Sequence, residues 1–217
     1  MSYLILPILF TFQFFIQNNK PVFTKSPEDY LPPPKAIQHF TSGLKIVIAD
    51  SLWLRALQDF DYCNDKINER DCVGQSWLFQ VLDLATTLDP KFEPSMYQIG
   101  GLALTVIISD YAGASIYFDR GVEQYPKHWH LNYAAAYHAL YEEKNKVKAA
   151  RLYLAAADNG APPWVRIMAG RLGYEGGDKA FGEQVLQQMI DTNQDEKLIE
   201  VLKHRLSKLK AETAPEK

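Results

Sequence analysis

The sequence lacks features that are typical of several functional classes of protein, namely many cysteines and an excess of basic residues. Only two of its 217 residues are cysteines, which excludes a disulfide-rich mini-protein and a four-cysteine zinc site. It has no basic excess, because 23 Lys and Arg residues face 26 Asp and Glu residues. Nucleic-acid-binding proteins usually carry such an excess, so we expect no nucleic-acid partner.

Catalytic motifs are absent as well. The chain has no HExxH, GxSxG or paired CxxC motif, and no Gly-rich phosphate loop. The sharpest enzymatic hypothesis is a metal site formed by His128, His130 and His138. No acidic residue lies between His128 and His138 to add an oxygen ligand, so histidines of a helix start and a groove are the favoured interpretation. We expect no enzymatic activity, no cofactor and no metal.

The N-terminus is the most apolar part of the chain. Residues 3–16 read YLILPILFTFQFFI. A helix of this length spans about 21 Å, less than a bilayer core of roughly 30 Å, and it matches the apolar region of a secretory signal. No Lys or Arg precedes the run and no Ala-x-Ala site follows it. Residues 1–17 are therefore predicted to be an uncleaved membrane anchor or a degenerate export signal. The alternative is an apolar arm that packs on this protein or on a partner.

Two features of the sequence predict opposite sides of the membrane for the domain that follows the apolar run. Lys20 and Lys25 follow the apolar run, and the positive-inside rule then favours a cytoplasmic domain. Cys63 and Cys72 enclose a short polar stretch that a disulfide could close outside the cytoplasm, the alternative being two free thiols. We favour the bacterial inner membrane with a periplasmic domain, and the cytoplasmic face remains the alternative.

A proline-rich linker separates this segment from a helical region. Residues 18–34, NNKPVFTKSPEDYLPPP, hold five of the twelve prolines and predict a stiff, extended spacer. After Pro34 the apolar residues recur every three or four positions. This spacing predicts one long helix over residues 35–62.

The remaining chain contains a repeat. Pro90, Pro126 and Pro162 are 36 residues apart. Small, large and small residues precede the last two prolines at equal offsets: Ala114, Phe118, Gly121 and Ala150, Leu154, Ala157, with a fourth copy at Gly182, Leu186, Met189. Residues at these offsets share one helix face, and the small ones let another helix approach closely. Upstream helical stretches carry small residues of their own, namely Gly100, Ala136 and Gly170. The repeating unit is thus a pair of helices.

These features resemble the tetratricopeptide repeat family, whose helix–turn–helix units stack into a superhelix. Ala114, Phe118 and Gly121 match its small–aromatic–small pattern, and residues 85–90, ATTLDP, are close to the usual end of the repeat. The period of 36 and the missing early tryptophan depart from the family. The resemblance implies an all-α, tetratricopeptide-like helical-hairpin solenoid over residues 35–211. It would have about four helix pairs, a capping helix over residues 196–210 and a frayed tail over residues 212–217.

The resemblance also implies a binding groove lined by the first helix of each pair. The groove residues carried over are Tyr97, His130, Tyr133, Tyr137, Tyr141, Trp164, Arg171 and Tyr174. Tyr133, Tyr137 and Tyr141 share one helix face whatever the family, and an ordinary aromatic core stripe is the alternative interpretation.

The expected function is a non-enzymatic protein–protein interaction scaffold. It would be tethered to the membrane through residues 3–16 and bind a peptide segment or a subunit of a cell-envelope assembly of the pilus, secretion or motility type. The alternative is a constitutive structural subunit of a membrane complex, whose hydrophobic N-terminal arm packs into a partner.

Overall fold

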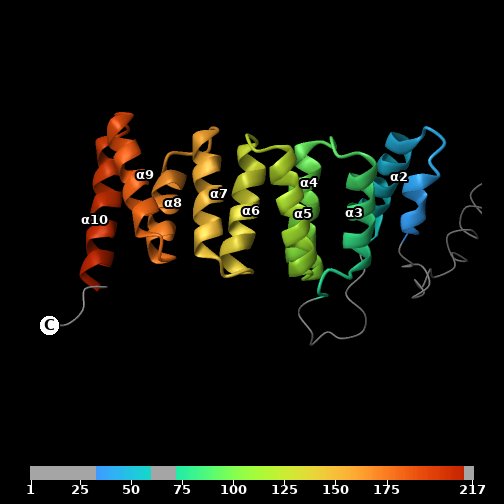
Figure 1. Ribbon diagram of the computed structural model, residues 1–217, viewed down its shortest axis with the longest axis horizontal. Coiled ribbons are helices and arrows are strands. Elements are labelled where there is room, and N and C mark those ends of the chain that lie inside the picture. The colour runs from blue at the N-terminus through green and yellow to red at the C-terminus, as the bar shows by residue number, and fades with distance from the viewer. Residues whose placement is uncertain (1–32, 60–71, 213–217) are drawn as a thin grey trace, which may run out of the picture. The chain divides into compact units, whose positions relative to one another are not determined.

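The computed structural model describes residues 33–59 and 72–212. The predicted anchor, nearly all of the linker and residues 213–217 lie outside the described residues. Within them, all regular elements are helical (Figure 1). In chain order they are the 3₁₀ helix η3 (Lys35–His39), α2 (Lys45–Gln58), α3 (Trp77–Leu88), α4 (Pro94–Leu102), the π-helix η4 (Ala103–Ile108), α5 (Tyr111–Gln124), α6 (Trp129–Tyr141), α7 (Lys146–Asp158), α8 (Trp164–Glu175), α9 (Lys179–Asp191) and α10 (Glu196–Glu212).

Neighbouring helices pack side by side along the chain (Figure 1). α2 packs on α3, α4 on α5, α6 on α7 and α8 on α9, which gives four hairpins. The first helices of the second and third hairpins also meet, because α4 packs on α6, and the last helix, α10, packs on α8. Helices α4, α6 and α8 begin at Pro94, Trp129 and Trp164, each 35 residues after the last. For residues 33–59 and 72–212, the prediction of an all-helical fold whose helices pack as in a helical repeat is confirmed.

The predicted long helix over residues 35–62 is wrong. The 3₁₀ helix ends at His39 and α2 begins only at Lys45. Between them, Ser42 and Gly43 have φ angles of 48° and 82°. This left-handed conformation cannot continue a right-handed helix, and glycine adopts it without steric cost. Gly43 was therefore a helix-stop signal that the apolar spacing concealed.

The small residues of the repeat lie where helices approach most closely. A Cβ atom added to Gly121 of α5 would lie 2.7 Å from the Cβ of Tyr97 in α4. One added to Gly100 would lie 2.7 Å from the ring of Tyr117, and one at Gly170 would lie 3.0 Å from Leu202. These distances explain why the repeat keeps a small residue at each position.

Buried polar groups join the first hairpin to the second. The carboxylate of Asp110 caps α5 by accepting a bond from the Gly113 N–H. It also accepts bonds from the Gly74 N–H at 2.7 Å and from the Ser76 hydroxyl at 2.5 Å. Asp110 is fully buried, so these charge-assisted bonds replace the water that the carboxylate loses on folding.

Arg120 of α5 adds a second connection to the same hairpin. Its guanidinium lies 2.6 Å from the Asp83 carboxylate and 2.6 Å from the Thr86 hydroxyl, both on α3. Hairpins one and two are thus joined by polar groups at both ends of α5.

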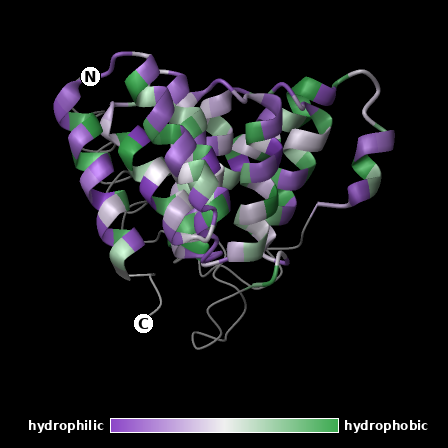
Figure 2. Cartoon of the chain, turned by 60° about the vertical axis from the view of Figure 1, so that its left-hand side comes forward, coloured by the Kyte–Doolittle hydropathy of each residue, from purple (hydrophilic) through white to green (hydrophobic). Residues whose placement is uncertain are grey.

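Residues 196–210, predicted to form a capping helix, lie within α10. Leu202 and Leu206 are buried in a cluster with Val185 and Met189 of α9. The other faces of α10 are mostly charged and exposed, and the helix that leads to the C label in Figure 2 is mainly hydrophilic. A polar outer face of this kind closes an array of stacked helices without leaving an apolar end.

Candidate functional site

Exposed aromatic side chains gather on α6 and α8. Tyr137 and Tyr141 of α6 are 43% and 48% exposed, and Trp164 at the start of α8 is 47% exposed. The Tyr137 and Tyr141 rings lie 4.5 Å apart. Tyr133 is half-buried and meets Trp164 edge-on, with ring centroids 6.0 Å apart. We name Tyr133, Tyr137, Tyr141 and Trp164 the aromatic surface.

Another tyrosine supports this surface from beneath. Tyr153 of α7 is fully buried and packs edge-on against Tyr133 at 5.2 Å. Its hydroxyl is buried and has no hydrogen-bond partner among the described residues. Burial raises the pKa of Tyr153, and the neighbouring Tyr133, Tyr141 and Tyr137 raise it further. Tyr153 is therefore a core residue that lies close to the exposed rings.

His130 and Arg171, also predicted for the groove, lie on the same two helices. His130 is exposed and its ring stacks on that of Trp129 at 3.5 Å. Arg171 is partly exposed, with its Nε 3.4 Å from the carboxylate of Glu175 one turn later. Both side chains can reach solvent, and Arg171 would have to share its charge between Glu175 and any bound carboxylate.

Two predicted groove residues belong to the core instead. Tyr97 is fully buried against Tyr117, and its hydroxyl donates to the Pro90 carbonyl at 3.1 Å. Burial raises the pKa of Tyr97 to about 12. Tyr174 is 4% exposed and packs with Val185 and its neighbours. Neither side chain is open to a partner, which corrects their assignment to the groove.

The three histidines of the metal hypothesis do not come together. The His128 and His130 rings lie 5.6 Å apart, and the His128 side chain caps α6 by accepting from the Leu131 N–H. His138 is buried elsewhere, with its ring nitrogens 2.9 Å from the hydroxyls of Thr105 and Ser115. Within residues 33–59 and 72–212, no three His, Cys, Asp or Glu side chains are arranged to hold a metal ion.

A charged cluster lies beside His138. Lys148 of α7 is 2.8 Å from both Glu143 and Asp119. Burial alone would lower the pKa of Lys148, but the hydrogen bonds to Asp119 and Glu143 raise it above its usual value. Burial alone would raise the pKa of Glu143, but the hydrogen bonds from Lys148 and Ser115 bring this pKa below its usual value. The ion pair of Lys148 with Asp119 ties α7 to α5.

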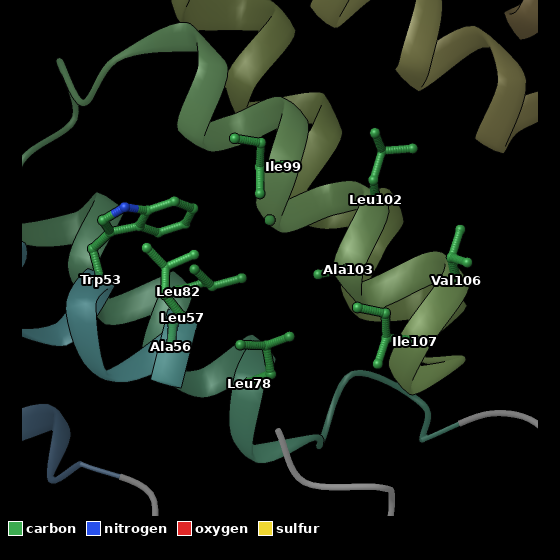
Figure 3. A pocket seen from close by; sticks show the side chains of 11 residues that line it. Trp53, Ala56, Leu57, Leu78, Leu82, Ile99, Leu102, Ala103, Val106 and Ile107 are labelled. Atoms are coloured by element: carbon green, nitrogen blue, oxygen red, sulfur yellow. The ribbon is translucent and has the colours of Figure 1, made fainter. Parts of the chain in front are cut away.

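The sequence reasoning missed an apolar pocket at the first two hairpins. It has a volume of about 380 Å³ and lies between α2, α3 and α4–η4 (Figure 3). Its lining includes Trp53 and Leu57 of α2, Leu78 and Leu82 of α3, and Ile99 and Ile107 of α4–η4. One signal was present in the sequence. Residues 102–108, LALTVII, are apolar except for Thr105, which is more apolar surface than one buried helix face requires.

Two remaining predictions concern the membrane and the cysteines. No helix in the described part of the chain combines the length and apolarity that crossing a bilayer requires. Cys72 is bonded in a disulfide, while Cys63 lies outside the described residues, so the pairing of the two stays a prediction.

Comparisons with known proteins add no neighbour to this description. No protein-family model, no curated protein and no solved structure matches the chain.

Proposed function

We propose that this chain is a non-enzymatic protein–protein interaction scaffold of the tetratricopeptide type. Its aromatic surface on α6 and α8 binds a peptide segment or subunit of a cell-envelope assembly. Residues 3–16 tether it to the bacterial inner membrane, with the helical array on the periplasmic side.

The observation that carries this proposal is the exposure of large rings on a helix whose core needs none. The buried face of α6 is built mainly from alanines: Ala134, Ala135, Ala136 and Ala139. Tyr137 and Tyr141 are nearly half exposed although each could bury a large apolar area. Tyrosine and tryptophan dominate binding energies at interfaces because they combine apolar area, a polar tip and few rotatable bonds.

The repeat architecture supports the same proposal. α6 and α8 are the first helices of the third and fourth hairpins, and these are the helices that line the groove in the family that the sequence resembles. The small residues Gly100, Ala136 and Gly170 are buried on the first helices. This pattern favours a tetratricopeptide-like solenoid.

The test is a cross-linked co-purification from native membranes. The wild type is compared with Tyr137→Ala/Tyr141→Ala and with the control Ile116→Ala/Ile190→Ala. The control removes two side chains that are 50% and 46% exposed on α5 and α9, two helices that carry no residue of the aromatic surface. Circular dichroism checks that all three proteins fold.

We expect the tyrosine double variant to lose a partner that the wild type and the control retain. Each lost ring should weaken capture by about 2 kcal/mol or more if it is a binding hot spot. Equal capture by all three proteins would overturn the proposal and direct attention to the N-terminal segment.

A further inference from the structure

A second exposed surface lies on α2 and differs in its chemistry. Ile46, Val47, Leu54 and Leu57 are 62%, 58%, 57% and 48% exposed. On a helix of 3.6 residues per turn, these four side chains fall within an arc of about 100°. Four large aliphatic side chains on an arc of this width are typical of a helix face that another element covers. We name these four residues the aliphatic surface.

The apolar pocket continues this surface toward the second hairpin. Leu57 belongs to both, and the facing wall of the pocket is formed by α4 and η4 (Figure 3). Ile99, Val106 and Ile107 of that wall are 49%, 70% and 40% exposed. The first helices of the second and third hairpins pack directly on each other, because α4 packs on α6. At the first two hairpins a pocket of about 380 Å³ lies between them instead.

The concentration of aliphatic residues sets this region apart. The other exposed aliphatic residues after η4 are Ile116, Ile190 and Val201, on three different helices. Single exposed apolar residues are ordinary, whereas a large contiguous patch marks an interaction site.

A single carboxylate decides what kind of occupant fits. Asp50 is exposed and falls near the middle of the arc that Ile46, Val47, Leu54 and Leu57 define. No ion pair or hydrogen bond to its carboxylate is found within the described residues. Covering the surface would take this charge out of water, which is costly unless the occupant brings a cation. The interior of a bilayer offers no cation, so burying the Asp50 carboxylate in lipid would be costly.

We propose that the aliphatic surface and the pocket bind an amphipathic helix of a partner protein. Leu, Ile or Val side chains of that helix fill the pocket, and a Lys or Arg on its apolar edge pairs with Asp50. The size supports a helix, since the 14 residues of α2 extend for about 21 Å. A lone acyl chain would fill the pocket and leave Ile46 and Val47 uncovered. This site is separate from the aromatic surface and does not depend on its function.

The test uses two model peptides of equal length as probes. One is an amphipathic helix of Leu and Lys, and the other is its counterpart of Leu and Glu. Binding of each labelled peptide to the full-length protein in detergent is followed by fluorescence anisotropy. Neutral phosphatidylcholine vesicles serve as the membrane probe.

Two variants and two controls test the contacts. Leu57→Gln/Ile107→Gln alters both walls of the pocket at exposed positions, and its control is Ile116→Gln/Ile190→Gln. Asp50→Lys reverses the central charge. Its control is Glu123→Lys, which makes the same charge change on an exposed part of α5.

We expect the Leu/Lys peptide to bind the wild type and to bind Leu57→Gln/Ile107→Gln at least about tenfold more weakly. Asp50→Lys should reverse the preference to the Leu/Glu peptide, whereas Glu123→Lys should not.

Three results would overturn the proposal. The first is a peptide preference that does not respond to Asp50→Lys. The second is binding of vesicles, but not of peptides, through Leu57 and Ile107. The third is peptide binding only after residues 1–32 are removed, which would make the chain's own N-terminus the occupant.

Discussion

The aromatic surface and the aliphatic surface both expose apolar area, but only the side chains of the aromatic surface also carry polar atoms. Tyr137 and Tyr141 each end in a hydroxyl that can bind water when no partner is present. Ile46 and Leu54 have no polar atom on their side chains, and the adjoining pocket is lined by apolar residues. The first kind of surface suits a partner that comes and goes. The second kind gains most from a partner that stays.

The cores beneath the two surfaces also differ, both in the size of their buried side chains and in how closely the helices pack. The core of α6, α7 and α8 is built largely from fully buried alanines, including Ala136, Ala139 and Ala149. Alanines let the helices approach closely and leave little void. The core below the aliphatic surface uses large residues such as Leu78 and Leu82, which also line the pocket. Tight packing thus accompanies the aromatic surface, and open space accompanies the aliphatic one.

The largest expected effect is a loss of folding stability in a variant of Tyr153, the buried residue beneath the aromatic surface. Tyr153→Ala should lower the free energy of unfolding by about 3 to 5 kcal/mol, because it empties a fully buried site. Tyr137→Ala should change it by less than about 1 kcal/mol, because that ring is 43% exposed. Urea denaturation of both variants measures the difference. Equal losses would mean that Tyr137 belongs to the core.

The next effect concerns the connection between the first two hairpins. Asp110→Ala leaves the N–H groups of Gly74 and Gly113 and the Ser76 hydroxyl without their acceptor. We expect the free energy of unfolding to fall by about 3 kcal/mol.

Asp178→Ala is the control for Asp110→Ala, since Asp178 caps α9 but is not fully buried. Its loss should cost about 1 kcal/mol. Similar values for the two variants in urea denaturation would show that the buried bonds of Asp110 add nothing beyond a helix cap.

A finer comparison uses hydroxyl groups alone. Tyr97→Phe removes a bond to the Pro90 carbonyl and should cost about 1 kcal/mol. Tyr153→Phe removes a buried hydroxyl that has no partner among the described residues, so it should be neutral or stabilising by up to about 1 kcal/mol. Thermal denaturation resolves the two variants. A loss in Tyr153→Phe as large as in Tyr97→Phe would contradict this account.

The smallest effect is a pH dependence at the junction of the two regions, where His138 meets Thr105 of η4 and Ser115 of α5. Burial lowers the pKa of His138 below 6.5, Glu143 and Glu142 oppose this lowering, and Lys148 adds to it. The unfolded chain then binds more protons than the folded one around and below pH 6.5. Folding stability should therefore fall as the pH drops through this range.

Melting temperatures between about pH 7.5 and pH 5.5 check this sign. The dependence of the melting temperature on pH should be weaker in His138→Gln, because a glutamine side chain does not titrate in this range. A slope that is unchanged in this variant would assign the pH dependence to other groups.

The sequence predicted the helices and their pairing because these depend on local patterns. Pro90 and Pro126 end helix pairs, and Gly100 and Gly121 mark close helix contacts. Gly43 was overlooked because an isolated glycine inside an apolar pattern is compatible with a helix. Its positive φ angle is visible only in the structure.

The candidate site was predicted less well, for a physical reason. Helical spacing shows which residues share a face, but not whether another helix covers that face. Tyr97 of α4 and Tyr133 of α6 are 36 residues apart and hold matching places in the repeat, yet Tyr97 is fully buried against Tyr117 of α5 while Tyr133 is only half-buried. The pairing of Asp110 with Gly74 across 36 residues also has no local signature.

The polar links made by Asp110 and Arg120 have a consequence for how the chain opens. In an array where each hairpin touches mainly its neighbours, the end units unfold first and the middle last. The links bind the first hairpin to α5, so its amide protons should exchange with solvent together with those of α5 rather than by separate fraying. Hydrogen exchange would then show protection rising in steps along the chain toward α6 and α7, whose alanine-lined contact opens last.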